Sequence, residues 1–380
     1  MMLSFTAAAL AAALSAQPAS DTHAYPDAFS AYSDYNSESE LSIDYSVWSG
    51  LLSDIVFDVG MSDRRPARAQ APVRTGTRLR AGSNSPYRNE GNRIIYHLIE
   101  DDRAEAISEY RAELIALADS LPLSRLNGNE QLAFWLNLHN VILIDEIIQA
   151  YPEPRVNPPW SRGSNFFDRP VATLNSVEVS LNDIQAFVIE TWDDPRVIYG
   201  FHLGAIGGPS ITSQAFAGNR VWNQLNRIGR EYVNSLRGVG STPGALRVSA
   251  LYTHHQDAFD SWPADLHAHL LTYAQSDVEQ IIRRATNEVQ TITYASEIAD
   301  LTNGRNCGSA GASFNVRTTD SDGNFRFNGA CDPLPPQAAE LIRQIQLRQL
   351  RFIREGRYGR VTVTDIQTPS SSEEPQDPDS

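Results

Sequence analysis

Residues 129–140 read NEQLAFWLNLHN and open a segment that predicts a buried helix. Apolar residues would cover most of the circumference of this helix, which is typical of a helix enclosed in a core. They are Leu132, Trp135, Leu136, Leu138, Val141, Ile142, Ile144, Ile147 and Ile148. We expect the helix to end before Pro152 and Pro154, because proline removes a hydrogen-bond donor and clashes with the preceding turn.

Three amide side chains interrupt this apolar helix, namely Gln131, Asn137 and Asn140. A buried amide without partners costs roughly 1–3 kcal/mol, so each must form hydrogen bonds. One interpretation is that the amides hold neighbouring loops in place, since buried polar groups are usually satisfied within the protein. The other interpretation is that they form the wall of a binding site.

The composition excludes several classes of function. The chain has 380 residues, and all 31 of its basic residues are arginine. The absence of lysine excludes a Schiff-base enzyme and a P-loop nucleotide site. The net charge of −15 argues against a nucleic-acid partner, which requires patches that neutralise phosphates.

The N-terminus predicts export. Residues 3–14 form an Ala-rich apolar run that is too short to cross a bilayer, and small residues around Ala16 offer a cleavage site. We therefore expect a signal peptide over residues 1–16, a loose leader over 17–40, and a periplasmic or secreted protein. No later segment is apolar enough to span a membrane.

Cys307 and Cys331 are the two cysteines of the chain. In an exported protein they predict one disulfide, which would stabilise its loop by about 3 kcal/mol. The alternative is a reactive thiol, which requires a nearby base and an electropositive pocket. Residues 305–366 would then comprise this loop and a C-terminal helix.

Elsewhere the sequence predicts helices mixed with short strands. Helices are expected over residues 47–59, 91–121, 181–192, 215–236 and 263–286, with strands over 171–181, 196–203 and 246–252. A long loop is expected over 63–90 and a glycine-rich turn over 204–209, while Ser180 or Asn182 could cap the helix at 181. This order favours a helix-rich α+β fold with a small sheet, in one domain over residues 41–304.

The C-terminal helix after Pro336 is amphipathic, and one face carries Arg343, Arg348, Arg351, Arg354 and Arg357. Such a face could contact an acidic envelope surface or a protein partner. More commonly it would be solvated while the helix packs on its own acidic domain. Residues 367–380 are rich in Ser, Pro, Glu and Asp and predict a disordered tail.

The helix at 129–140, followed by Tyr151-Pro152, resembles the hallmark of the DUF547 family, whose members are largely uncharacterised. His139 stands where the family has a tyrosine. The resemblance continues through residues 179–184, 194–196 and 207–211, and it covers roughly residues 37–304.

Many members of this family look like papain-type thiol hydrolases, so the resemblance implies a papain-like fold. It places Gln185-Ala186 and Ile198 at the family's histidine positions, and Leu203 and Gly208 at its cysteine positions. None of these residues can act as base or nucleophile, and residues 1–306 contain no cysteine. The chain therefore reads as a degenerate member that lacks the thiol site.

We favour a non-catalytic binding or scaffolding protein of the cell envelope. Its cleft would include His139 and the glycine-rich turn. The cleft residues are Gln131, Asn137, Asn140, Gly204, Gly207 and Gly208. The alternative is a hydrolase with a rearranged site, in which His202 or His139 is the base and Ser210 the nucleophile, with Asp194 as the carboxylate. No nucleophile-elbow pattern accompanies Ser210, which disfavours this alternative.

A second polar cluster contains His254-His255-Gln256-Asp257, followed by Asp265, His267 and His269. Histidine and carboxylate together can bind Zn²⁺. The spacing is unsuitable, because His267 and His269 would not share a helix face and no His-Glu-x-x-His pattern is present. We therefore predict no metal and no cofactor.

Overall fold

The computed structural model describes residues 27–69, 84–304 except 162, 164, 165 and 287, and 336–356. The expected signal peptide, the first part of the leader, the two cysteines, Arg357 and the acidic tail lie outside these residues. The α-helices are α1 (Ser46–Ile55), α2 (Asp101–Ser120), α3 (Gly128–Ala150), α4 (Leu181–Trp192), α5 (Val221–Val233), α6 (Ala250–His254), α7 (Ala264–Tyr273), α8 (Ser276–Arg284) and α9 (Pro336–Arg354). The strands are β1 (Val56–Phe57), β2 (Arg93–Ile94), β3 (Ala172–Leu174), β4 (Val177–Val179), β5 (Val239–Thr242), β6 (Ala245–Ser249) and β7 (Val289–Ile292).

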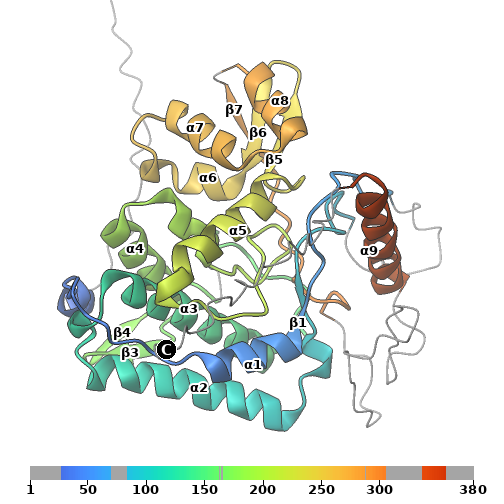
Figure 1. Ribbon diagram of the computed structural model, residues 1–380. Helices are drawn as coiled ribbons and strands as arrows, with labels where there is room; N and C mark the ends of the chain where they lie inside the picture. Colours follow the sequence, from blue (N-terminus) through green and yellow to red (C-terminus); the bar gives the residue numbers. More distant parts are fainter. Residues whose placement is uncertain are drawn as a thin grey trace, which may run out of the picture.

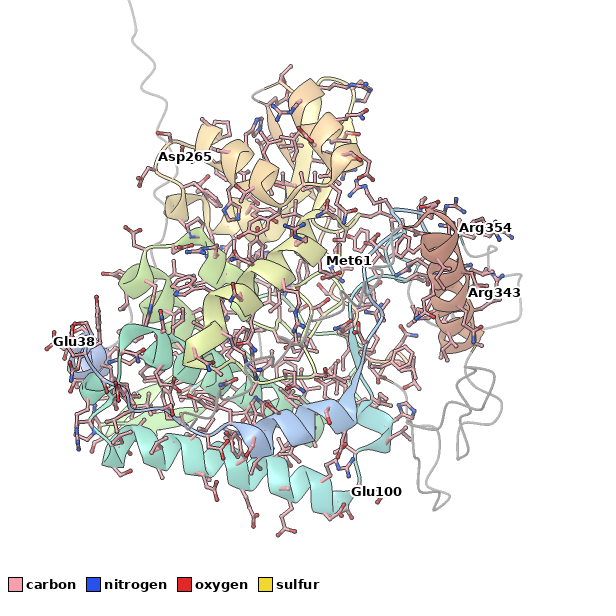
Figure 2. The ribbon with its side chains drawn as sticks, viewed as in Figure 1. Glu38, Met61, Glu100, Asp265, Arg343 and Arg354 are labelled. Carbon is pink, nitrogen blue, oxygen red and sulfur yellow. The ribbon has the colours of Figure 1, made fainter. Side chains whose placement is uncertain are left out.

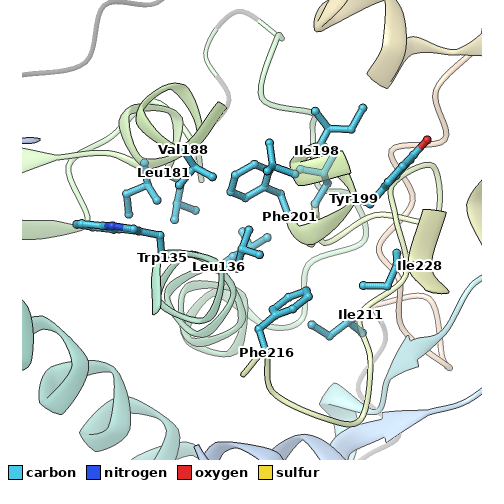
Figure 3. Close-up of a cluster of buried hydrophobic side chains, with 14 of the residues drawn as sticks. Trp135, Leu136, Leu181, Val188, Ile198, Tyr199, Phe201, Ile211, Phe216 and Ile228 are labelled. Carbon is cyan, nitrogen blue, oxygen red and sulfur yellow. The ribbon is translucent and has the colours of Figure 1, made fainter. Parts of the chain in front are cut away.

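Helix α3 runs through the centre of the molecule, as its sequence predicts. The Asn127 side chain caps it by accepting a hydrogen bond from the Glu130 N–H at 2.9 Å. Trp135 and Leu136 are fully buried. Figure 3 shows them beside Leu181 of α4 and Phe216 of the loop before α5. Burying a side chain such as Leu136 stabilises a fold by about 2 kcal/mol, so α3 contributes much of the core energy.

The other elements surround α3 in a clear order. Helices α1 and α2 lie along one side of it, and α4 and α5 cover the other (Figure 1). Helices α6 to α8 gather at the far end with the sheet β5-β6-β7 (Figure 1). In this sheet β5 and β6 are antiparallel while β6 and β7 are parallel. The prediction of a helix-rich α+β domain with small sheets is confirmed, whereas the papain-like description stays a prediction.

Seven predicted elements differ from those observed. The helix expected over 47–59 ends at Ile55 and is followed by β1, and the helix expected over 263–286 is divided into α7 and α8. Residues 196–203 form no strand; the chain there is the 3₁₀ helix η4 (Pro195–Gly200), whose first turn is fixed by Pro195 and by the Asp194 side chain, which accepts from the Arg196 N–H at 2.9 Å. The expected strand over 171–181 is a hairpin of β3 and β4. Its turn, Asn175-Ser176, has positive φ angles of 48° and 65°.

Strand β6 ends at Ser249, because the Ser249 side chain caps α6 by accepting from the Leu251 N–H at 3.1 Å. The helical region expected over 91–121 begins only at Asp101, after strand β2. The helix expected over 215–236 covers only 221–233, since the preceding residues form a loop against α3. The segment 181–192 is helical throughout, and Ser180 and Asp183 form its capping box.

The end of the expected leader differs from a loose segment. Residues 27–32 form the 3₁₀ helix η1 (Asp27–Tyr32), and Phe29 is fully buried. The Phe29 ring lies 5.5 Å from the Trp135 ring and 4.8 Å from the Phe187 ring. Aromatic contacts of this kind explain why the segment is ordered against α3 and α4.

Helix α9 stands at the edge of the molecule and packs on a small core of its own (Figure 1). Two of its arginines bind the domain: the Arg348 guanidinium donates to the carbonyls of Val59, Met61 and Asn89 at 2.9–3.3 Å, and Arg351 pairs with Asp63. The arginine face is thus partly used within the chain.

The outer side of α9 carries the exposed residues Arg343 and Arg354 (Figure 2). Leu350 and Ile353 are also exposed there, at 58% and 59%. A partner for this helix stays a prediction. No helix among the described residues is long and apolar enough to cross a membrane.

Candidate functional site

Asn137 of α3 holds the loop before α5 through two hydrogen bonds. Its Nδ2 donates to the Phe216 carbonyl at 2.9 Å, and its Oδ1 accepts from the Phe216 N–H at 3.0 Å. Asn137 and Phe216 are only 1% and 4% exposed. The amide therefore forms the same pair of hydrogen bonds that a neighbouring strand would form with Phe216. It satisfies backbone groups that water cannot reach.

Asn140 and Gln131 act in the same way on other loops. Asn140 Nδ2 donates to the Gly200 carbonyl, and its Oδ1 accepts from the His202 N–H, both at 2.9 Å. Gln131 Nε2 donates to the carbonyls of Asp34 and Leu123 at 2.7 and 2.8 Å. All three amides are therefore engaged with the backbone, as the loop-holding interpretation expects.

The glycine-rich turn is also enclosed. A side chain at Gly208 would meet the Leu203 side chain at 2.9 Å, and one at Gly207 would meet the Ala295 backbone at 2.8 Å. Gly204 has a φ angle of 68°, which favours glycine. These glycines permit close packing of the chain. They do not border the pocket described below, and neither do Gln131, Asn137 and Asn140.

The residues that the resemblance places at histidine and cysteine positions fall on α4 and on the segment after it. Ile198 and Leu203 are 0% and 1% exposed and pack into the core. Gln185, by contrast, borders a pocket, and its Nε2 lies 2.9 Å from Nε2 of His139. A hydrogen bond therefore connects two residues that lie far apart in the sequence.

The hydrogen bonds around His139 determine its tautomer. Because the Gln185 amide nitrogen can only donate, His139 Nε2 accepts from it. His139 Nδ1 then carries the proton and donates to Asn140 Oδ1 at 3.1 Å. Burial lowers the pKa of His139 to about 3, and the ring sits edge-on to Phe201. His139 is therefore a neutral structural residue at physiological pH.

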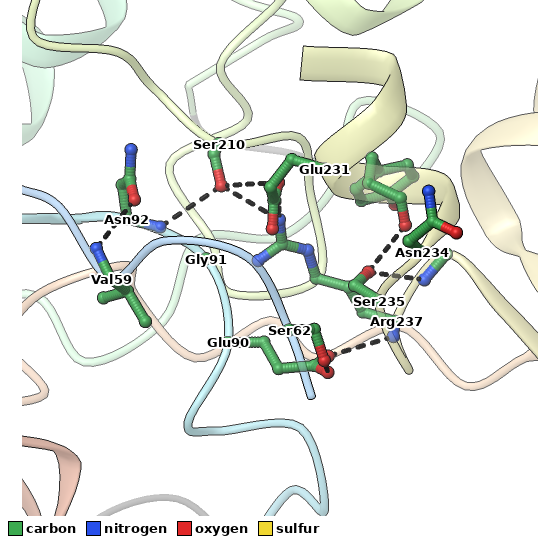
Figure 4. Close-up of polar contacts among 12 residues, drawn as sticks. Val59, Ser62, Glu90, Gly91, Asn92, Ser210, Glu231, Asn234, Ser235 and Arg237 are labelled. Atoms are coloured by element: carbon green, nitrogen blue, oxygen red, sulfur yellow. Dashed lines mark hydrogen bonds and ion pairs between the residues drawn. The ribbon is translucent and has the colours of Figure 1, made fainter. Parts of the chain in front are cut away.

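Ser210 and His202 do not form a catalytic pair. The Ser210 hydroxyl donates to Glu231 Oε2 at 3.0 Å and accepts from Arg237 Nη2 at 2.9 Å (Figure 4). It also accepts from the Asn92 N–H at 3.2 Å. No hydrogen bond joins Ser210 to the His202 imidazole among the residues that the structure describes. Ser210 is instead part of a buried charge network.

The remaining residues of the rearranged hydrolase are also occupied elsewhere. Burial lowers the pKa of His202 to about 4. The Asp194 carboxylate binds Arg196, with contacts of 2.6–3.0 Å to its guanidinium. The triad that the sequence left open, His202, Ser210 and Asp194, is thus not assembled.

The histidines of the second polar cluster separate in space. His269 Nε2 lies 2.8 Å from the Tyr199 hydroxyl and the ring stacks on Tyr199. His254 and His255 lie against each other, with ring centroids 4.6 Å apart. Within the described part of the chain, no group of three His, Cys, Asp or Glu side chains converges as a metal site would require.

A pocket of about 850 Å³ lies where α4 meets α6 and the loop before β3. Its volume is typical of small-molecule sites. Its walls come from three parts of the chain that are distant in sequence. They are Pro159, Trp160, Ser161 and Asp168 from the loop, Asn182, Gln185, Ala186, Ile189, Glu190, Asp193 and Asp194 from α4 and its end, and Thr253, His254, His255, Gln256, Asp257 and Ala258.

The aromatic side of this pocket is built by Trp160 and His254, whose ring centroids are 4.9 Å apart. Tyr294 meets Trp160 edge-on at 5.3 Å and supports it from behind. Burial lowers the pKa of both histidines, that of His255 to about 3, and Asp257 partly offsets the effect at His254. The lowered pKa favours the neutral form of both imidazoles.

Some residues of this pocket were recognisable in the sequence, but the sequence did not indicate that they lie together. Residues 254–257 stood out as a polar cluster, and Gln185 stood out as a substituted histidine position. Trp160 gave no signal beyond an irregular aromatic segment. Only the packing of α4 beside α6 brings the three together, because they lie on separate segments of the chain.

The sequence model of the DUF547 family, proteins of unknown function, matches residues 123–233. This segment includes α3, α4, the glycine-rich turn and α5. No curated protein and no solved structure matches the chain. Two walls of the pocket, the loop at 159–168 and α4 with Gln185, therefore belong to the matched segment, while the wall formed by residues 253–258 lies beyond it.

Proposed function

We propose that this chain, whose residues 123–233 match the model of the DUF547 family of proteins of unknown function, is a non-catalytic binding protein that holds a small ligand in the pocket between α4 and α6. The observation that carries this proposal is the position of Gln185. A residue at the family's histidine position borders the pocket, yet it presents an amide that cannot exchange protons near neutral pH.

The surroundings of Gln185 also favour binding over catalysis. Leu203 and Gly208, at the family's cysteine positions, offer no nucleophile. His139 donates and accepts hydrogen bonds with neutral amides and holds Gln185 in place. A pocket with a fixed amide, an aromatic wall and carboxylates can recognise a ligand by shape and hydrogen bonding without transforming it.

Blocking the pocket tests this proposal. In Ala186→Trp, an indole would project into the pocket from α4, whereas Thr173→Trp places the same side chain on the exposed face of β3 as a matched control. The full chain would be screened by saturation-transfer NMR against a mixed library of amines, carboxylic acids and neutral polyols. We expect Ala186→Trp to abolish the signals and Thr173→Trp to retain them, with circular dichroism confirming that both variants are folded.

Two results would overturn the proposal. One is that no class of probe binds, or that binding persists in folded Ala186→Trp. The other is turnover of ester, amide or peptide substrates that His202→Ala abolishes, which would favour the hydrolase alternative.

We also propose that the protein works outside the cytoplasm, in the periplasm or after secretion. The apolar run at residues 3–14 and the small residues around Ala16 support this setting. Fractionation of cells carrying a C-terminally tagged full chain should recover a shortened protein in the extracytoplasmic fraction. Recovery of the uncleaved chain in the cytoplasm would contradict it.

A further inference from the structure

The carboxylates around the pocket between α4 and α6 outnumber the cations that could neutralise them. Five border it: Asp168, Glu190, Asp193, Asp194 and Asp257. No arginine is among the described residues that line it. Since the chain contains no lysine, the described residues that line the pocket carry an excess of negative charge.

The internal contacts of these carboxylates leave most of that charge in place. Asp194 is paired with Arg196, whose guanidinium also stacks over the Trp222 ring at 4.3 Å. Asp168 accepts a hydrogen bond from the Asn182 amide at 2.7 Å. Glu190, Asp193 and Asp257 are exposed at the pocket rim. Like charges around one pocket repel one another, so a bound cation would relieve that repulsion.

The arrangement does not fit a bare metal ion. The carboxylates stand on opposite walls, from the loop at 159–168, from α4 and from residues 253–258, and no three of the described acidic or histidine side chains converge on one point. A metal ion requires several ligands within about 2.0–2.6 Å of one centre. Separated carboxylates instead fit a ligand whose positive charges are themselves separated.

Apolar groups lie between these carboxylates. Pro159, Ala186, Ile189 and Ala258 supply aliphatic surface, and Trp160 supplies an aromatic ring. Aliphatic surface favours methylene groups by the hydrophobic effect. The Trp160 ring can attract an ammonium group by a cation–π interaction. At one wall, Gln185 forms its single described hydrogen bond through Nε2, which leaves its amide oxygen to accept from a ligand N–H.

We propose that the ligand is a linear aliphatic polyamine, held by its ammonium groups at the carboxylates and by its methylene chain against the apolar wall. This inference rests on the proposed binding function and names the chemical class of its ligand. The carboxylate of Glu190 and that of Asp257 would bind charges from opposite sides of the pocket, and Trp160 would bind a third.

Isothermal titration calorimetry of the full chain with spermidine tests this inference. Hexane-1,6-diol and adipate serve as neutral and acidic probes with similar aliphatic chains. We expect spermidine alone to bind, and its affinity to fall as NaCl is raised from 20 to 500 mM, because salt screens exposed charges over about 10 Å at 0.1 M.

Variants assign the binding to the pocket. The double variant Glu190→Gln and Asp257→Asn should weaken spermidine about tenfold, because each exposed ion pair contributes up to about a factor of five. Glu178→Gln, which removes an exposed carboxylate from β4 outside the pocket, should leave the affinity unchanged. Trp160→Leu should weaken spermidine about threefold, and Trp160→Phe should restore most of the affinity.

The outcomes separate this inference from the proposed function. If hexane-1,6-diol or adipate binds and Ala186→Trp blocks it while spermidine does not bind, the pocket is a binding site and the polyamine inference is wrong. If spermidine binds equally to the double variant and to Glu178→Gln, the attraction is a general property of the acidic surface and the inference is also wrong. If none of the three probes binds and the mixed library yields no ligand, both proposals fail.

Discussion

Replacing Asn137 with leucine removes both hydrogen bonds that hold the loop before α5. Leucine branches at the same carbon as asparagine and is somewhat larger, so the change removes the amide without leaving a cavity. The Phe216 N–H and carbonyl would each lose a partner at 3.0 and 2.9 Å in a region that water does not reach. Each orphaned group costs about 1–3 kcal/mol, and the added apolar burial offsets part of the sum.

We therefore expect Asn137→Leu to lower the free energy of unfolding by about 3 kcal/mol. That corresponds to a loss of about two orders of magnitude in the folding equilibrium and of about 6–12 °C in Tm for a domain of this size. Urea unfolding followed by tryptophan fluorescence would measure the change, because Trp135 lies on the same helix.

Asn129→Leu is the matched control. Asn129 is also on α3 and accepts a hydrogen bond from Trp222 Nε1 at 2.8 Å, but it is exposed, so water replaces the lost partner. Its cost should stay below about 1 kcal/mol. A loss at Asn137 no larger than that at Asn129 would refute the argument that the buried amide holds the loop.

Three further predictions follow from single features of the structure. The pKa of His139 is about 3 in the folded chain and 6.5 in the unfolded chain. Between pH 6.5 and pH 3 the unfolded chain therefore binds a proton at His139 that the folded chain does not. The contribution of His139 to the free energy of unfolding is complete above pH 6.5. As the pH is lowered it decreases, by about 2 kcal/mol at pH 5. Thermal melts over a series of pH values should therefore show a smaller decrease in stability for His139→Gln than for the parent. Arg348→Leu removes three hydrogen bonds to backbone carbonyls and should speed tryptic release of α9 several-fold, whereas Arg343→Leu, on the exposed side, should not. Ser180→Ala removes the capping box of α4 and should cost about 1 kcal/mol in urea unfolding.

Each of these has a clear contrary result. An equal pH dependence in His139→Gln would mean that other groups control acid unfolding. Equal proteolysis of the Arg348 and Arg343 variants would mean that apolar packing alone holds α9. A Ser180→Ala variant as stable as the parent would mean that the tertiary contacts of α4 make its cap redundant.

The sequence predicted the elements whose patterns are local. Helix α3 was predicted because apolar residues recur on all its sides, and α4 because Ser180 or Asn182 could cap an apolar run. Residues 196–203 were expected as a strand because they are apolar. A short apolar run does not distinguish a strand from a buried 3₁₀ turn, and here Pro195 and the capping Asp194 side chain favour the turn.

The candidate site was predicted less well than the fold. The amides of α3 were correctly expected to need partners, yet the sequence left open whether those were loops or a ligand. Satisfying a buried amide depends on which backbone lies opposite, and for Asn137 this is Phe216, far along the chain. The site residues Trp160 and Glu190 were missed because an isolated aromatic or acidic residue has no distinctive spacing.

By itself the sequence determined the chemistry that this protein lacks and the helix around which it is built. The absence of lysine, the absence of cysteine before residue 307 and the apolar pattern of α3 are properties of composition and periodicity, which need no coordinates. The tertiary structure decided where polar side chains meet. It enclosed Asn137 and Ser210 among neighbours and gathered Gln185, Trp160 and Asp257 around one pocket, because such meetings depend on long-range packing that no local pattern encodes.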